Sequence, residues 1–148
     1  MEEKFKNYLS CNKEDIVLAL TDRSYRSVQS QQDLPINNDY ATIGDAYLKF
    51  ILSEMLIDKK IAKLSEEKQR YESDAALVNI AKHYKVLDKL KYNEEQKVKD
   101  YDYKSSPKKH KFIATAMEAL LYAIYLINKD DAKEVVYEWV DIIDKERK

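Results

Sequence analysis

Residues 40–57, YATIGDAYLKFILSEMLI, decide the fold of this chain. Apolar side chains occupy most of the helical circumference of this stretch, which is typical of a central helix rather than a surface helix. Its polar residues follow three- and four-residue steps and so form one stripe. They are Thr42, Asp45, Lys49 and Ser53. One side of this helix is therefore expected to face water or a ligand.

A second apolar stretch, residues 112–128, repeats this pattern and carries a single charge, Glu118. A carboxylate inside an apolar helix is costly to bury without a partner. If the two helices pack together, Glu118 meets Asp45, and carboxylates from neighbouring core helices are a known way to hold a divalent cation. Magnesium is the natural candidate because it prefers carboxylate and water oxygens.

The sole glycine of the chain, Gly44, lies inside the first of these helices. Glycine within a helix costs about 1 kcal/mol relative to alanine, so its presence requires a reason. We expect a close backbone approach here, which would bring the Glu118 helix against the Asp45 helix. Two structural alternatives to a metal site stay open. In the first, Asp45 only stabilises the amides at the start of its helix. In the second, Glu118 forms a buried ion pair with Lys49 or Lys111.

The rest of the chain predicts further helices joined by polar connections. Because the sequence has only Gly 1 and Pro 2, it offers little material for tight hairpins, and the predicted fold class is all-α. The hydrophobic content of 45% and charged content of 36% fit one folded domain over residues 1–148. The expected helices cover residues 13–25, 59–72, 74–84 and 132–143, and the expected loops cover 27–38 and 93–111.

Charge and cysteine content restrict the cellular context. A formal net charge of −1 gives no overall attraction for nucleic acid, so RNA contacts must come from local basic patches or from metal ions at carboxylates. The single cysteine, Cys11, cannot form an intramolecular disulfide, and the acidic start lacks the apolar run of a signal peptide. No stretch approaches about 18 uninterrupted apolar residues. We therefore expect a cytoplasmic protein without a membrane partner.

Three motifs, in order along the chain, resemble the ribonuclease III family. Residues 19–25, ALTDRSY, are similar to the ALTHRSY opening of its catalytic domains, with Asp22 where the family usually has histidine. Residues 37–48, which end in IGDAYL, resemble the signature NERLEFLGDAVL. Residues 111–126, KFIATAMEALLYAIYL, resemble KVLADVFEALIGAIYL. Residues 73–90 are weakly similar to the intervening stretch, so the resemblance spans most of the chain.

This resemblance implies a ribonuclease III-like helical domain that forms a two-fold homodimer. Such proteins hydrolyse double-stranded RNA with magnesium, or with manganese as a substitute, through four carboxylates per subunit. Two of the four match Asp45 and Glu118, which makes these the candidate catalytic residues and metal ligands. The other two positions hold Ala41 and Thr115, and Asn38 replaces an auxiliary glutamate.

Neutral oxygens are the nearby replacements for the lost carboxylates. Thr42 lies three residues before Asp45, and Thr115 lies three before Glu118, so both hydroxyls are candidate metal ligands. Hydroxyls add no charge, whereas a two-metal site clusters negative charge so that cations about 3.5–4 Å apart clamp the reacting oxygens. The two carboxylates are therefore expected to hold one cation weakly.

Two functions stay open for a chain of this family. The first is an endoribonuclease that acts on double-stranded or structured RNA by metal-dependent phosphodiester hydrolysis. The second is a catalytically inactive RNA-binding or assembly module, and outside the family a helical interaction protein without an RNA role remains.

Contacts with RNA would have to come from the chain's own surface. The basic run Lys108, Lys109 and Lys111 offers phosphate contacts, although such runs also occur as solvated faces. The 148 residues leave no room for an appended double-stranded RNA-binding domain. The dimer surface or a helper protein would therefore position the RNA, which is read mostly by shape and backbone.

Overall fold

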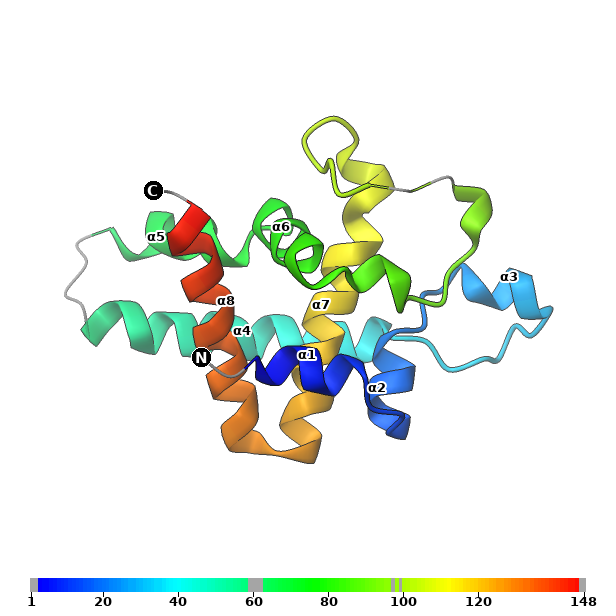
Figure 1. The fold of residues 1–148 in the computed structure, drawn as a ribbon, viewed down its shortest axis with the longest axis horizontal. Helices are drawn as coiled ribbons and strands as arrows, with labels where there is room; N and C mark the ends of the chain where they lie inside the picture. Colours follow the sequence, from blue (N-terminus) through cyan, green and yellow to red (C-terminus); the bar gives the residue numbers. More distant parts are fainter. Residues whose placement is uncertain (1–2, 59–62, 97, 99, 147–148) are drawn as a thin grey trace.

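Helices make up the fold throughout the described part of the chain, so the predicted all-α class is confirmed (Figure 1). The computed structural model describes residues 3–58, 63–96, 98 and 100–146. Within these residues the one β-type contact is an isolated bridge between Thr21 and Lys91. The helices are α1 (Lys4–Leu9), α2 (Glu14–Ala19), α3 (Tyr25–Gln29), α4 (Asn38–Asp58), α5 (Leu64–Glu72), α6 (Asp74–Tyr84), η1 (Val86–Asp88), η2 (Glu94–Gln96), α7 (Pro107–Ile127) and α8 (Lys129–Glu146).

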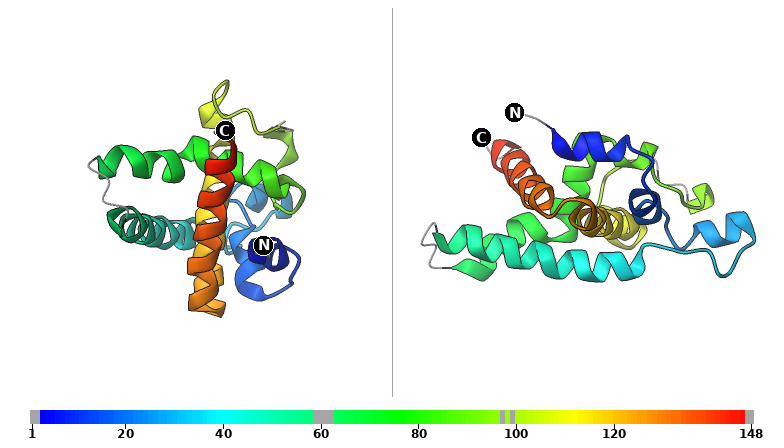
Figure 2. Two further views of the ribbon diagram at one scale, coloured as in Figure 1. Left: turned by 60° about the vertical axis from the view of Figure 1, so that its left-hand side comes forward. Right: turned by 90° about the horizontal axis from the view of Figure 1, so that it is seen from below.

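Helix α7 lies at the centre of the fold, where it packs against α2, α4, α6 and α8. Figures 1 and 2 show α7 crossing α4 and α8 running back from the end of α7. Met117 and Leu120 on α7 are fully buried. By length and composition alone α7 would be able to cross a membrane, but 56% of its apolar window is buried in the fold, as expected of a core helix.

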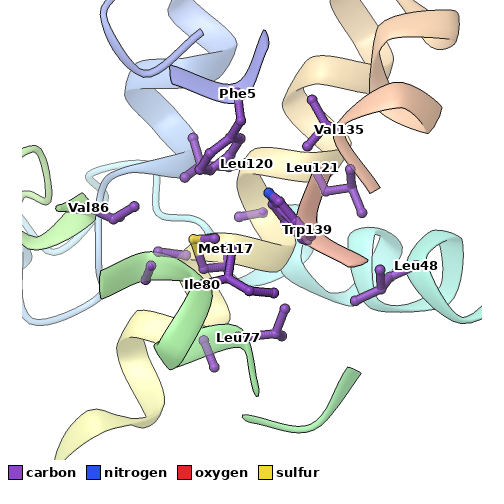
Figure 3. Packing of buried hydrophobic residues seen from close by; sticks show 14 of the residues in the cluster. Phe5, Leu48, Leu77, Ile80, Val86, Met117, Leu120, Leu121, Val135 and Trp139 are labelled. Atoms are coloured by element: carbon purple, nitrogen blue, oxygen red, sulfur yellow. The ribbon is translucent and has the colours of Figure 1, made fainter. Parts of the chain in front are cut away.

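The core forms where α7 meets α4, α6 and α8, and α1 packs against α8 beside it (Figure 3). Phe5 is fully buried, and its ring contacts those of Tyr84 and Trp139 at centroid distances of 4.7 and 5.2 Å. Sequence analysis assigned no helix to α1, because so short a segment has too few turns to show a periodic pattern. Other large core side chains are Leu48, Leu77, Ile80, Val86, Met117, Leu120, Leu121 and Val135.

Helix α4 is buried on one face only, which corrects the expectation of a helix that is central on most sides. The buried face carries the leucines Leu48, Leu52 and Leu56. Ile43, Phe50 and Ile57 follow a seven-residue spacing, and they are 45%, 61% and 61% exposed. These three residues, here named the α4 stripe, form an apolar surface that the described part of the chain leaves uncovered.

Two expected boundaries differ from the structure. The helix predicted over 13–25 is observed only as α2, and α3 lies mostly in the stretch that was predicted as a loop, 27–38. Between α2 and α3 the chain forms an Asx turn, in which Asp22 Oδ2 accepts hydrogen bonds from the Ser24 amide at 3.0 Å and the Ser24 hydroxyl at 2.6 Å. The connection predicted over 93–111 ends earlier, because α7 begins at Pro107, a first-turn position that proline favours.

The other predicted helices are observed with small changes in extent. Residues 74–84 form α6, and residues 132–143 lie within α8. The helix predicted over 59–72 is observed from Leu64 as α5. Residues 59–62 of that prediction lie outside the described residues.

Candidate active site

The crossing of α4 and α7 is set by Gly44. A Cβ atom built on Gly44 would lie 1.8 Å from the carbonyl oxygen of Glu118 and 2.7 Å from its carbonyl carbon. Only the hydrogen of glycine fits in this space, because a side-chain carbon would overlap the backbone of α7. The prediction that Gly44 brings the Glu118 helix against the Asp45 helix is confirmed.

Asp45 of α4 and Glu118 of α7 face each other beside this crossing and share a hydrogen bond, so we name them the carboxyl pair. Burial, together with the hydrogen bond and charge of Asp45, raises the pKa of Glu118 to about 9. Partial burial acts to raise the pKa of Asp45, but hydrogen bonds with Glu118 and Lys49 hold it below its usual value. At neutral pH the pair therefore shares one proton, carried by Glu118.

The two nearby lysines pair with carboxylates other than Glu118. Lys49 Nζ lies 2.6 Å from Asp45 Oδ1, one helical turn away. Lys111 Nζ lies 2.9 Å from Asp74 Oδ2. An ion pair between Glu118 and either lysine is thus absent among the described residues, and that alternative is wrong. Asp45 also lies beyond the first turn of α4, so it does not serve as a helix-start carboxylate.

The junction of α5 and α6 closes the site on a third side. Ser73 is the single residue between the two helices, and its Oγ accepts a hydrogen bond from the Ala76 amide at 3.1 Å as the N-cap of α6. The acids on either side of this cap, Glu72 and Asp74, line the same cleft as the carboxyl pair. The cap therefore fixes two further carboxylates beside the pair.

The resulting cleft has a volume of about 320 Å³ and opens to solvent between α4, α7 and this junction. A larger hollow of about 700 Å³ lies between α1, α6 and α8, but it contains none of the residues that the sequence singled out. The smaller cleft is the candidate active site because it contains the carboxyl pair. Its lining residues are Asp45, Lys49, Gln69, Glu72, Ser73, Asp74, Ala75, Tyr103 and Glu118.

Glu72 is a buried carboxylate that sequence analysis missed. The residue is 8% exposed, and its Oε1 accepts a hydrogen bond from Gln69 Nε2 at 3.3 Å. Its Oε2 is buried without a hydrogen-bond partner among the described residues. The only signal in the sequence is its place next to the serine cap, because an acid in the charged segment 59–72 otherwise looks solvent-exposed.

A sequence profile of the ribonuclease III domain matches residues 38–129, which include both members of the carboxyl pair. The chain belongs to the ribonuclease III domain family. Family and fold together support an endoribonuclease-like function on RNA. No curated protein gave a match.

Two solved structures of the ribonuclease III nuclease domain from Campylobacter jejuni share this fold. The first is similar over 97% of this chain and 94% of the other, with a TM-score of 0.72 and 20% identity. The second, which describes structural flexibility in a region involved in dimer formation, is similar over 94% of this chain and 95% of the other. Its TM-score is 0.73 at 21% identity.

Ribonuclease III proteins generally depend on divalent metal ions, so the residues of the cleft have to fit one. Among the described residues, no three acidic, histidine or cysteine side chains are close enough to bind one ion directly. The carboxyl pair supplies two ligands, and Glu72, whose buried Oε2 has no hydrogen-bond partner among the described residues, lines the same cleft. This set fits a single cation that keeps several waters, as Mg²⁺ does, but not a two-metal clamp.

The predicted neutral ligands do not line the cleft. Thr42 Oγ1 and Thr115 Oγ1 each donate a hydrogen bond of 3.2 Å to the carbonyl one turn earlier on their own helix. Ala41 is 7% exposed and packs in the core. The structure therefore brings Asp45 and Glu118 together and leaves the two threonine hydroxyls outside the site.

The predicted RNA contacts lie at the start of α7 rather than in a loop. They are Lys108, Lys109 and Lys111, all exposed. Between them His110 is 3% exposed, with Nδ1 2.8 Å from the Ser106 carbonyl oxygen and Nε2 2.7 Å from Asp100 Oδ1. His110 thus fixes this basic turn of the ribonuclease III domain, and Lys111 reaches the cleft through its ion pair with Asp74.

Proposed function

We propose that this ribonuclease III domain is an endoribonuclease that cleaves double-stranded or structured RNA by metal-dependent phosphodiester hydrolysis. The observation that carries the proposal is the carboxyl pair. Two acids from different core helices are held together in an open cleft, at a crossing where only glycine fits. Without a metal ion the pair shares one proton, and a divalent cation bound by both carboxylates would take the place of that proton.

Asp45 and Glu118 would hold one Mg²⁺, or Mn²⁺ as a substitute, and leave the remaining positions to water and phosphate oxygens. When bound, such a cation polarises a phosphate and activates a water molecule. Lys49 lines the same cleft and offers a positive charge to a second phosphate oxygen. The side chains of this chain would therefore bind and orient the scissile phosphate.

The basic turn at the start of α7 supports RNA binding beside this site. Because the net charge is −1, electrostatic attraction to RNA has to come from local basic patches. Lys108 and Lys109 are exposed on the turn that leads to Lys111 at the cleft. A duplex of A form is contacted mainly through its backbone, so these lysines would position RNA without reading its sequence.

The α4 stripe supports a homodimer as the working form. Ile43, Phe50 and Ile57 repeat every seven residues along an uncovered helix face, which is the pattern of an apolar seam between two helices. The proposed occupant is the same stripe of a second copy, related by a two-fold axis. Sedimentation velocity tests this dimer. Phe50→Asp should give monomers, and the control Glu66→Gln, which removes a charge at an exposed position of α5, should leave the dimer intact. A monomeric wild-type protein would contradict the dimer.

A cleavage assay tests the proposed activity. Purified protein with Mg²⁺ or Mn²⁺ should cut long duplex RNA, and Asp45→Asn and Glu118→Gln should each remove the activity. Asp39→Asn, an exposed change on the first turn of the same helix and outside the cleft, should leave it intact. Wild-type protein that leaves the RNA whole under these conditions would rule out the endonuclease.

A catalytically inactive RNA-binding or assembly module is the second candidate, and one observation favours it. Lys49 already neutralises Asp45 at 2.6 Å, so part of the site is satisfied without a metal ion. The variant Ala41→Glu with Thr115→Asp separates the two functions. If wild-type protein is inactive and this double variant cuts duplex RNA, the inactive module is the correct function.

We place this activity in the cytoplasm, where Cys11 would stay reduced as the free cysteine seen here. The RNA would be positioned by the dimer surface or by a helper protein. Purified protein that cuts its RNA at one site without additions would exclude the need for a helper. Fractionation of cells, followed by detection of the protein, tests the compartment.

A further inference from the structure

The buried Oε2 atom of Glu72 has no partner in the described structure, and that is an unusual state for a carboxylate. A buried charged oxygen without a hydrogen bond costs stability, so it persists where a ligand or ordered water completes it. The weak 3.3 Å contact from Gln69 serves only Oε1. The remaining oxygen thus has an unused capacity to accept hydrogen bonds.

The surroundings of Glu72 indicate which ligand would complete it. Glu72 lines the cleft together with the carboxyl pair and Asp74. Lys49 pairs with Asp45, and Lys111 pairs with Asp74, so the lysines near the cleft are committed to other acids. Among the described residues, Glu72 and Glu118 are the cleft carboxylates without an ion pair, and Glu118 shares a proton with Asp45. A positively charged ligand in the cleft would be attracted to Glu72.

We propose that Glu72 is the third carboxylate of the metal site, where its free Oε2 accepts hydrogen bonds from water molecules of a cation held by Asp45 and Glu118. This inference rests on the proposed function. Glu72 acts through water because no three acids of the described chain are close enough to bind one ion directly. Mg²⁺ keeps several of its waters in proteins, and carboxylates that bind those waters tune its affinity.

This role explains how the site works without acids at Ala41 and Thr115. Those positions contribute no charge, and α4 and α7 offer no other acid to the cleft. Glu72 comes from α5 instead and restores one negative charge from a different direction. When the cation is bound, three carboxylates rather than two then contribute negative charge to the site.

Titration calorimetry of the full chain with Mn²⁺ tests the inference without reference to activity. Glu72→Gln keeps the shape of the side chain and removes its charge, and it should weaken Mn²⁺ binding about tenfold or more. Glu66→Gln removes the same charge from an exposed position of the same helix and should bind Mn²⁺ like wild type. Glu72→Asp, which keeps the charge, should retain more affinity than Glu72→Gln.

Thermal unfolding separates this role from a purely structural one. Without metal, Glu72→Gln should unfold at the wild-type temperature or above it, because an unpaired buried charge has been removed. The rise in unfolding temperature caused by Mn²⁺ should be smaller than in wild type. A structural role predicts lower stability without metal and an unchanged rise.

Asp45→Asn distinguishes failure of the inference from failure of the proposed function. If Asp45→Asn loses Mn²⁺ binding while Glu72→Gln keeps it, the role of Glu72 is overturned and the metal site stands. If Asp45→Asn binds Mn²⁺ like wild type, the metal site itself is wrong, and the inference about Glu72 falls with it.

Discussion

Gly44→Ala tests the contact on which the site depends. The added Cβ would lie 1.8 Å from the Glu118 carbonyl oxygen, and such atoms essentially never come closer than 3.0 Å. Helix α7 would therefore have to move away from α4 by at least about 1.2 Å at this point. Because α7 also packs against α2, α6 and α8, this movement would disturb the whole core.

The expected cost follows from two opposing effects. Overpacking a close-packed interior costs about 1–3 kcal/mol, and a clash with backbone belongs at the upper end of that range. Alanine gains about 1 kcal/mol over glycine inside a helix, which offsets part of the loss. The net loss in the free energy of unfolding should be about 2 kcal/mol, a large part of the 5–15 kcal/mol that is typical of domains.

Urea denaturation followed by circular dichroism measures this loss. Ala46→Gly, two residues along α4 at an exposed position, is the matched control and should cost only about 1 kcal/mol. Gly44→Ala should also weaken Mn²⁺ binding, because it separates the two members of the carboxyl pair. A variant that is as stable as wild type, or about 1 kcal/mol more stable, with unchanged Mn²⁺ binding would refute the close contact.

Three further predictions concern the rest of the fold. Phe5→Ala should cost about 3–5 kcal/mol in urea denaturation, because Phe5 is fully buried; a loss below about 1 kcal/mol would show that α1 is not packed. The double variant Lys108→Ala, Lys109→Ala should lower the salt dependence of duplex RNA binding by about two phosphate contacts, and an unchanged slope would exclude these lysines. The hydrogen bond from the Tyr8 hydroxyl lowers the pKa of Asp131 below its ordinary 3.8. The stability that this hydrogen bond adds is present above pH 3.8 and is lost as the pH falls below it. Asp131→Asn should therefore lower the free energy of unfolding by about 1.5 kcal/mol at pH 7 and leave it unchanged at strongly acidic pH. An equal loss at both pH values would contradict the role of this hydrogen bond.

The sequence predicts the two core helices well because their signals are local. A long apolar run with one polar stripe fixes both the extent of α4 and the side on which Asp45 lies. A glycine inside such a run has few explanations other than a close contact, and the 1.8 Å distance bears this out. These inferences need only helical geometry and the cost of a buried charge.

Tertiary contacts decide the features that the sequence leaves open. Phe5 belongs to the core only because Tyr84 and Trp139, from α6 and α8, surround it. The break between α2 and α3 depends on the bridge between Thr21 and Lys91 and on the side-chain hydrogen bond of Asp22, neither of which the helical spacing of the motif reveals. The exposure of the α4 stripe likewise depends on where the other helices end. The periodic pattern of α4 carries no information about those ends.

The same distinction explains why half of the cleft carboxylates are visible in the sequence and half are not. Asp45 and Glu118 stand out because each is a lone acid on an apolar helix, so the cost of burial marks them. Glu72 and Asp74 lie among other charges, and only the cap at Ser73 turns them toward the cleft. The charge of such a site is therefore a property of the fold rather than of one motif. An acid lost from α4 or α7 can then be replaced by one from a neighbouring helix end, which is the role that we propose for Glu72.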